Sequence, residues 1–390
     1  MILKIKPQYL LVLLSLPLIS LISCSSTEEV TTDSTCYASS SYCASPVSVT
    51  GISSATAISG GRDHMCSLIS GGTAKCWGDN YQGQLGNGST TDSSSPVSVS
   101  NISTATGINA GENHTCAVLD NGTIMCWGDN ALWQLGNGSS TDSSSPVSVS
   151  NISTATAVTG GLYHTCALLD NNTVQCWGSG LYGQLGNGYG SDSSSPVTVA
   201  NITTATAVTT GDYHSCALLD NNTIQCWGSG SYGSLGNGSN SNSNTPVTVS
   251  GISTASTIDA GEDHTCAVLS DNTVQCWGYG LYGNLGNGSY SNSNIPVTVS
   301  NISTATAVAG GEDFNCALLS GGTISCWGNG SYGSFGNGNL GSSNVINTPV
   351  INSSVNASSV AAGDDFTCIL ESGGTIKCFG DNDNGQLGGW

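Results

Sequence analysis

The sequence predicts an all-β fold, a seven-bladed β-propeller of four-stranded antiparallel blades whose ring is closed by the N-terminal strand. Three observations lead to this prediction: one stretch recurs seven times, each copy has the period-two patterning of strands, and no stretch has helical periodicity. The first cysteine of each copy recurs every 50 residues, with one interval of 52: Cys66, Cys116, Cys166, Cys216, Cys266, Cys316 and Cys368. Units of this length cannot bury their own faces and must stack on their neighbours.

The most regular part of each copy is a β-hairpin, as in residues 161–178. If Asp170-Asn171-Asn172 forms a type I turn with a G1 bulge, its third residue must have a positive φ. Only glycine and asparagine, which tolerate that conformation, occupy this position: Gly72, Gly122, Asn172, Asn222, Asn272, Gly322 and Gly374. The register then places Cys166 opposite Cys176 in a non-hydrogen-bonded pair, close enough for a disulfide.

The number of cysteines supports this pairing. Apart from Cys24, the 17 cysteines form the hairpin pairs and one further pair, Cys36 with Cys43, and an even remainder favours disulfides in an oxidising compartment. Metal ligation is the weaker alternative because no short Cys-x2–4-Cys knuckle occurs, and we expect no metal and no cofactor. The expected disulfide cysteines are Cys36, Cys43, Cys66, Cys76, Cys116, Cys126, Cys166, Cys176, Cys216, Cys226, Cys266, Cys276, Cys316, Cys326, Cys368 and Cys378.

The N-terminus resembles an export signal, because Lys4 and Lys6 precede an apolar run, residues 9–22, that is short for a membrane span. The ending Leu21-Ile22-Ser23-Cys24 resembles the lipobox of bacterial lipoproteins, which implies lipidation of Cys24. A plain secretory signal and a signal anchor are the alternatives.

This interpretation divides the chain into three segments. We expect a lipoprotein signal peptide in residues 1–23, a flexible Ser-, Thr- and Glu-rich tether in residues 24–45, and the seven-repeat propeller in residues 46–390. The protein would then be exported as an outer-membrane or cell-surface lipoprotein.

Each unit of the propeller has the same order of elements. An outer strand such as residues 196–199 is followed by a turn, an inner strand of small residues (205–208), a Gly-x-x-His turn, the cysteine hairpin and a long loop (229–245). Four strands in each of seven units predict a propeller. The chain opens with an outer strand, Pro46–Val49, that has no hairpin before it, so we expect this strand to pair with residues 376–379 and complete the last blade.

Two linked motifs resemble a known repeat. Gly161-x-x-His164-Thr165, and Trp177-Gly178 followed by Gly183-Gln184-Leu185-Gly186-x-Gly188, are similar to the regulator of chromosome condensation repeat. The resemblance covers residues 46–390 and implies a seven-bladed propeller. The chain departs from the pattern at four positions, Phe314, Phe366, Phe379 and Trp133.

The repeated histidines and tryptophans are expected to be structural, since a residue required once per blade ties that blade to its neighbour. The chain contains no nucleophile elbow, zinc-protease helix or phosphate-binding loop, so we expect no enzyme activity. The run Asp381–Gly385 resembles part of a calcium loop, but its glycine is out of register and no bidentate glutamate follows. It is interpreted as the final repeat loop.

Charge limits the partners. The formal net charge is −20, and removal of residues 1–23 would leave Arg62, Lys75 and Lys377 against 25 acidic residues, a net charge near −22. Such a body is repelled by nucleic acid and by anionic lipid headgroups. In this it departs from the namesake of the family, a chromatin-bound nucleotide exchange factor for a small GTPase.

We therefore expect a monomeric, non-catalytic binding or adhesion propeller with a protein or glycan partner, no nucleic acid, and membrane contact through the lipid anchor only. The alternatives implied by the resemblance are a secreted enzyme inhibitor and a guanine-nucleotide exchange factor. The Gly-x-x-His turns and the long loops emerge at the same end of the propeller, and loops on a rigid scaffold are where recognition is concentrated. The candidate binding residues are Asp63, Glu112, Tyr163, Tyr213, Glu262, Asp263, Glu312, Asp313, Asp364, Asp365, Trp133, Tyr182, Tyr232, Tyr282 and Tyr332.

Overall fold

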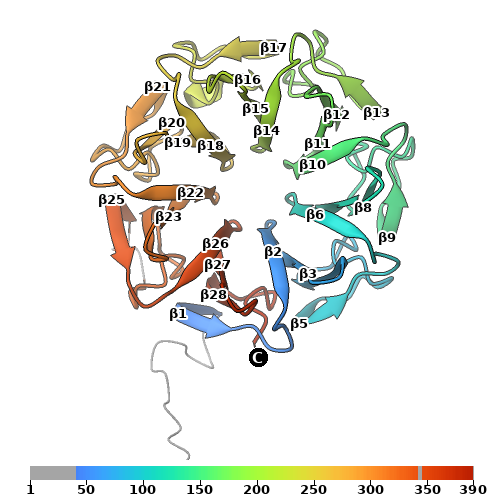
Figure 1. The fold of residues 1–390 in the computed structure, drawn as a ribbon, viewed down its shortest axis with the longest axis horizontal. Helices are drawn as coiled ribbons and strands as arrows, with labels where there is room; N and C mark the ends of the chain where they lie inside the picture. Colours follow the sequence, from blue (N-terminus) through green and yellow to red (C-terminus); the bar gives the residue numbers. More distant parts are fainter. Residues whose placement is uncertain (1–40, 341–344, 390) are drawn as a thin grey trace, which may run out of the picture. The chain divides into compact units, whose positions relative to one another are not determined.

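Seven four-stranded antiparallel sheets follow one another around a central axis in the computed structural model, which describes residues 41–340 and 345–389 (Figure 1). The predicted fold class is therefore confirmed. We number the blades 1 to 7 from β2 onward. Within residues 41–340 and 345–389 the helical content is one 3-10 turn, η1 (Ser231–Gly233), and no helix there could cross a membrane.

Each blade contains one strand at each of four radial positions. The innermost strands are β2 (Ala55–Gly60), β6 (Ala105–Ala110), β10 (Ala155–Gly160), β14 (Ala205–Thr210), β18 (Ala255–Ala260), β22 (Ala305–Gly310) and β26 (Ala357–Ala362). The second strands are β3 (His64–Ile69), β7 (His114–Leu119), β11 (His164–Leu169), β15 (His214–Leu219), β19 (His264–Leu269), β23 (Phe314–Leu319) and β27 (Phe366–Glu371). The third strands are β4 (Thr73–Gly78), β8 (Ile124–Gly128), β12 (Val174–Gly178), β16 (Ile224–Gly228), β20 (Val274–Gly278), β24 (Ile324–Asn329) and β28 (Ile376–Asp381). The outer strands are β5 (Ser93–Ser98), β9 (Ser143–Ser148), β13 (Ser193–Thr198), β17 (Ser243–Thr248), β21 (Ser293–Thr298), β25 (Val345–Asn352) and β1 (Tyr42–Ser48).

The ring closes through β1, which lies beside β28 in blade 7 as the sequence predicts (Figure 1). Val47 is opposite Cys378, and the amide of Val49 donates to the carbonyl of Ile376 at 2.9 Å. The strand begins earlier than the expected start at Pro46, since Tyr42 and Cys43 continue the pairing beyond a bulge. The irregularity spans Pro46, which has no N–H to donate to the ladder.

The predicted hairpin geometry is confirmed. Cys166 lies directly opposite Cys176, their Cα atoms are 4.0 Å apart, and the structure joins them in a disulfide, as it does the corresponding pair of every other blade. The third turn residue has a positive φ in all seven copies, for example 65° at Asn172. Cys43 is also disulfide-bonded, whereas its expected partner Cys36 and the expected lipidation residue Cys24 lie outside the described residues.

Neighbouring blades are joined through the Gly-Gln-Leu-Gly loop. The carbonyl oxygen of Gln84, in blade 1, accepts hydrogen bonds from two side chains of blade 2: Trp127 Nε1 at 2.8 Å and Thr115 Oγ1 at 3.0 Å. The buried ring of Trp127 packs against Gly86 so closely that a Cβ there would lie 2.7 Å from Nε1. The loop glycine is therefore required by the tryptophan of the next blade.

The histidines extend the same contact, which confirms their structural role. His64 Nε2 lies 2.8 Å from Thr115 Oγ1 of the next blade. Because Thr115 already donates its hydroxyl proton to Gln84, Nε2 must donate, which leaves Nδ1 as an unprotonated atom without a hydrogen-bond partner in the described structure. Burial lowers the pKa of His64 to about 3, so the ring is neutral.

Blades 5 and 6 satisfy the same requirements with different residues. His264 Nε2 lies 3.0 Å from Asn315 Oδ1, and Asn284 Nδ2 lies 3.2 Å from His264 Nδ1. In blade 6 the buried Phe314 fills the position of the histidine. The position therefore demands a large flat ring, and a hydrogen bond where the neighbouring blade offers a polar group.

We expect Gly186→Ala to destabilise the propeller more than Gly188→Ala. Both residues have positive φ, 63° and 89°, so each change costs about 1–2 kcal/mol in backbone strain. A Cβ at Gly186 would also lie 2.7 Å from Trp227 Nε1, whereas at Gly188 the nearest atom is 4.0 Å away, and this clash adds about 1–3 kcal/mol. Denaturant unfolding measures both variants; equal losses would show that the Trp227 contact does not constrain the loop.

Reduction of the hairpin disulfides should lower thermal stability. Each bond closes a short loop, with the two cysteines ten residues apart, worth up to about 3 kcal/mol in the chain-entropy estimate. Peptide mapping of the non-reduced protein should find Cys166 joined to Cys176, and the melting temperature should fall on addition of reductant. Free thiols at these two positions would contradict the pairing.

Candidate binding face

The Gly-x-x-His turns and the long loops lie at the same end of the ring, as expected from the antiparallel order of the strands. Tyr182, in the long loop of blade 3, has its ring 5.2 Å from that of Tyr213, in the turn of blade 4. We call this end of the propeller the binding face. The Asp-Asn-Asn turns of the hairpins, such as the one at Asp170, lie at the opposite end because each strand of the hairpin runs the length of the sheet.

A cavity of about 310 Å³ lies between the innermost strands and opens at this face. At one repeat position of the innermost strands, blades 1 to 5 each place a polar residue in the wall, namely Ser59, Asn109, Thr159, Thr209 and Asp259. Several of these reach the next blade: Ser59 Oγ accepts from the amide of Ala110 at 2.9 Å and Asn109 Oδ1 from that of Gly160 at 2.7 Å. The cavity wall is thus held by hydrogen bonds between blades.

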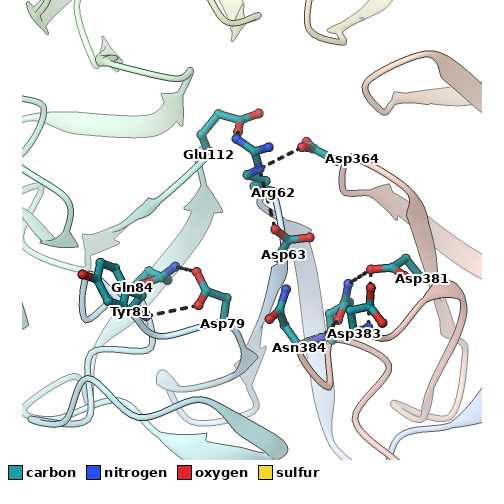
Figure 2. A network of polar contacts seen from close by, with 11 residues as sticks. Arg62, Asp63, Asp79, Tyr81, Gln84, Glu112, Asp364, Asp381, Asp383 and Asn384 are labelled. Atoms are coloured by element: carbon teal, nitrogen blue, oxygen red, sulfur yellow. Dashed lines mark hydrogen bonds and ion pairs between the residues drawn. The ribbon is translucent and has the colours of Figure 1, made fainter. Parts of the chain in front are cut away.

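Six residues at the first variable position of the Gly-x-x-His turns surround the cavity mouth: Arg62, Glu112, Asp212, Glu262, Glu312 and Asp364. Arg62 Nε lies 3.4 Å from Asp364 Oδ2 and 3.6 Å from Asp63 Oδ2, and its Nη1 lies 3.9 Å from Glu112 Oε2 (Figure 2). Arg62 and Asp212 were not among the candidate residues, although their turn position is the one that identified Glu112 and Asp364.

Burial is the main cause of the raised pKa values of the carboxyl groups at the cavity mouth. It raises the pKa of Glu112 to about 8, with a further increase from Asp212 that Arg62 partly opposes. Burial also raises the pKa values of Asp212 and Asp364 well above the usual range. The pKa of Glu262 is raised to about 7, again by burial first and then by nearby carboxylates.

The second variable residue of each turn does not line the cavity and is half-buried: Asp63, Asn113, Tyr163, Tyr213, Asp263, Asp313 and Asp365. Burial raises the pKa of Asp63 to about 6 and those of Asp313 and Asp365 to about 7. Acidic residues at this position are concentrated on blades 5, 6, 7 and 1, which adjoin one another around the ring.

Tyrosines occupy the long loops of blades 3 to 6. Tyr182, Tyr232, Tyr282 and Tyr332 are 40–45% exposed. Tyr279 was not among the candidate residues, although it directly follows a Trp-Gly step. Its ring lies 5.1 Å from that of Tyr232 and 6.1 Å from that of Tyr282. The aromatic residues therefore form contacts from loop to loop rather than standing singly.

The loops of blades 1, 2 and 7 have a different composition. In each, an aspartate accepts a hydrogen bond from the loop glutamine: Asp129 from Gln134, Asp381 from Gln386 and Asp79 from Gln84. Figure 2 shows the contact of Asp79 with Gln84. The candidate Trp133 lies in the loop of blade 2, half-buried, with φ 62° at a position where the other loops described have glycine. Backbone in this region is strained for a bulky residue.

The chemical groups available at the face are carboxylates, phenols and one guanidinium. In the part of the chain that the structure describes, no group of three His, Cys, Asp or Glu side chains is arranged to hold a metal ion. Carboxylates and one guanidinium line the cavity, and tyrosines lie on the surrounding loops, an arrangement that can bind cationic or hydrogen-bonding groups.

Comparison with known proteins defines the class. The sequence profile of the RCC1-like domain matches residues 44–314, and that of the regulator of chromosome condensation (RCC1) repeat matches residues 305–334 and 357–386. The chain belongs to the family of RCC1-like domains, propellers that serve as protein-binding scaffolds and are usually non-catalytic. No curated protein sequence matches it.

Solved structures share the fold at low sequence identity. Human WBSCR16 has a TM-score of 0.71 at 20% identity, covering 85% of this chain and 87% of that chain. Prp20p from Saccharomyces cerevisiae has a TM-score of 0.71 at 19% identity, covering 85% and 83%. The CRINKLY WD40 ectodomain of the Arabidopsis thaliana receptor kinase ACR4 has a TM-score of 0.52 at 20% identity, covering 86% and 97%.

The free energy of unfolding should decrease as pH rises from 7.5 to 8.5. Glu112, Glu262 and Asp313 have folded pKa values of about 7–8, above unfolded values near 4, so the folded state holds extra protons that it loses in this range. Above pH 7.5 the buried histidines contribute little to this dependence, because burial lowers their folded pKa values to about 3–4 and the unfolded rings, with an ordinary pKa of about 6.5, are also mostly neutral.

Glu112→Gln should reduce this pH dependence, whereas Glu371→Gln should not. The hydrogen bond from Lys377 lowers the pKa of Glu371, so that carboxylate is ionised in both states across the range. Urea unfolding at pH 7.5, 8.0 and 8.5 measures the slope. A stability that increases with pH, or an unchanged slope in Glu112→Gln, would contradict the assignment.

Proposed function

We propose that this RCC1-like propeller is a non-catalytic binding or adhesion protein outside the cytoplasm, and that it engages a partner protein through the binding face. The observation that carries the proposal is the composition of that face: loops with exposed tyrosines and carboxylates, supported by blades that are each braced by a disulfide. Tyrosine is enriched in protein interfaces and supplies much of their binding energy.

Two observations support a location outside the cytoplasm. Disulfides persist in oxidising compartments, and the structure has one in every blade. Two of the similar solved structures are ectodomains of plant receptor kinases. Anchoring through Cys24 remains part of the proposal and rests on the sequence of the N-terminal segment alone.

The test combines partner identification with substitutions at both ends of the ring. Partners cross-linked to the protein at the surface of intact producing cells are identified and purified, and their affinities are measured. Replacing Tyr182, Tyr232 and Tyr282 by Ser should weaken binding at least tenfold. Asp120→Asn with Asp170→Asn and Asp220→Asn, at the exposed hairpin turns of the opposite end, should change it less than twofold. Loss of binding in the second variant alone would place the interface at the opposite end.

A further inference from the structure

Basic side chains are scarce near the binding face. Within residues 41–340 and 345–389 they are Arg62, Lys75 and Lys377. Lys75 donates to the carbonyl of Gly51 at 3.3 Å, and Lys377 lies 2.8 Å from Glu371. Both lysines lie near the hairpin-turn ends of their strands, away from the cavity mouth. Arg62 is therefore the one described basic residue at the mouth.

The guanidinium of Arg62 is a cationic group held by carboxylates at the cavity mouth. Its guanidinium extends from blade 1 and lies between carboxylates of blades 2 and 7, Glu112 and Asp364 (Figure 2). The side chain remains 53% exposed, so the site is open to solvent while the charge is paired. Carboxylates supplied by different blades can thus converge on a single guanidinium.

The other half of the mouth has carboxylates without a described cation. Asp212, Glu262 and Glu312, from blades 4, 5 and 6, line the cavity and form no ion pair with any basic side chain in the described part of the chain. Burial is the largest cause of the raised pKa of Glu262; Asp263 and Glu312 raise it further by repulsion, and the more distant Arg62 opposes them only in part. A cation placed among them would relieve this repulsion.

Tyrosines border this half of the mouth and provide a second, independent feature. We call Tyr182, Tyr213, Tyr232, Tyr279 and Tyr282 the tyrosine arc. Tyr213 directly follows Asp212 in its turn, and burial together with Asp212 raises the pKa of Tyr213 to about 12, so its ring is a neutral phenol. Aromatic faces attract lysine and arginine, and partly exposed tyrosines offer contact area to the residues on either side.

From these observations we infer that the face binds a basic segment of its partner protein. An arginine or lysine side chain enters the cavity mouth beside Asp212, Glu262 and Glu312, and the neighbouring residues of the segment lie on the tyrosine arc. This inference rests on the proposed function and adds to it the chemistry of the partner. Charge complementarity favours a cationic segment over a neutral glycan, which would use the tyrosines and leave the carboxylates unpaired.

The probe is a synthetic peptide with three arginines separated by Gly-Ser, and its control is the same peptide with citrulline, the neutral analogue of arginine, at each position. Calorimetry at 150 mM salt should show that the purified protein binds the arginine peptide at least tenfold more tightly. Screening reduces diffuse attraction to a strongly acidic protein at this salt concentration.

Matched substitutions locate the binding. Glu262→Gln with Glu312→Gln should weaken binding of the arginine peptide at least tenfold, whereas Asp170→Asn with Asp220→Asn, the same change in charge at the opposite end, should change it less than twofold. The first pair removes repulsion between neighbouring carboxylates, so its melting temperature should be no lower than that of the unchanged protein. Replacing Tyr232 and Tyr282 by Ser should also weaken binding.

Two outcomes would overturn the inference. Equal losses in both carboxylate variants would mean attraction to the whole charged surface, and equal affinity for the arginine and citrulline peptides would mean that the partner segment is not basic. In either case the proposed function survives if the tyrosine substitutions still weaken binding of the cross-linked partner. It fails as well if those substitutions have no effect on the partner.

Discussion

The fold depends on one backbone carbonyl oxygen in the long loop of each blade, which accepts hydrogen bonds from side chains of the next blade. In the first junction this is the carbonyl of Gln84, which accepts from the indole of Trp127 and the hydroxyl of Thr115. The same geometry explains why Gly86 has no side chain and why the histidine of the first blade donates to that hydroxyl. Successive blades are thereby held at a fixed angle, which sets the ring and the cavity on its axis.

Much of this could be predicted because seven copies of a short unit constrain one another. The restriction of one turn position to Gly or Asn required a positive φ there, and this fixed the hairpin register and the pairing of Cys166 with Cys176. Local sequence determines such features because the interacting residues lie within a dozen positions. Ring closure could be predicted from the order of strands. The start of β1 at Tyr42 could not, because the pairing of Tyr42 and Cys43 is separated from that of Val47 by a bulge that includes Pro46.

The candidate site was less predictable for a physical reason. Arg62 meets Glu112 and Asp364 only because the ring brings blades 1, 2 and 7 together, and no periodic pattern encodes which of seven turn residues will pair. The unusual pKa values arise from burial at the cavity mouth, which depends on the tertiary structure. Tyr279 breaks the repeat at a position otherwise occupied by Asp, Ser or Asn, and its neighbours belong to two different loops.

Blade 7 is the only blade of the described ring assembled from both ends of the chain, and its junctions with its neighbours also differ in chemistry. At the junction of blades 6 and 7, the side chain of Phe379 has no N–H to donate to the carbonyl of Ser334, which among the described residues accepts only from Thr367. At the junction of blades 7 and 1, Met65 has no hydroxyl, so in the described ring the carbonyl of Gln386 accepts only from Trp77. A mechanical load applied at the N-terminal end of β1 would therefore reach the body through the β1–β28 ladder before any other strand. The propeller would yield first at its closing seam, where rupture releases one strand and leaves six blades with their own disulfides intact.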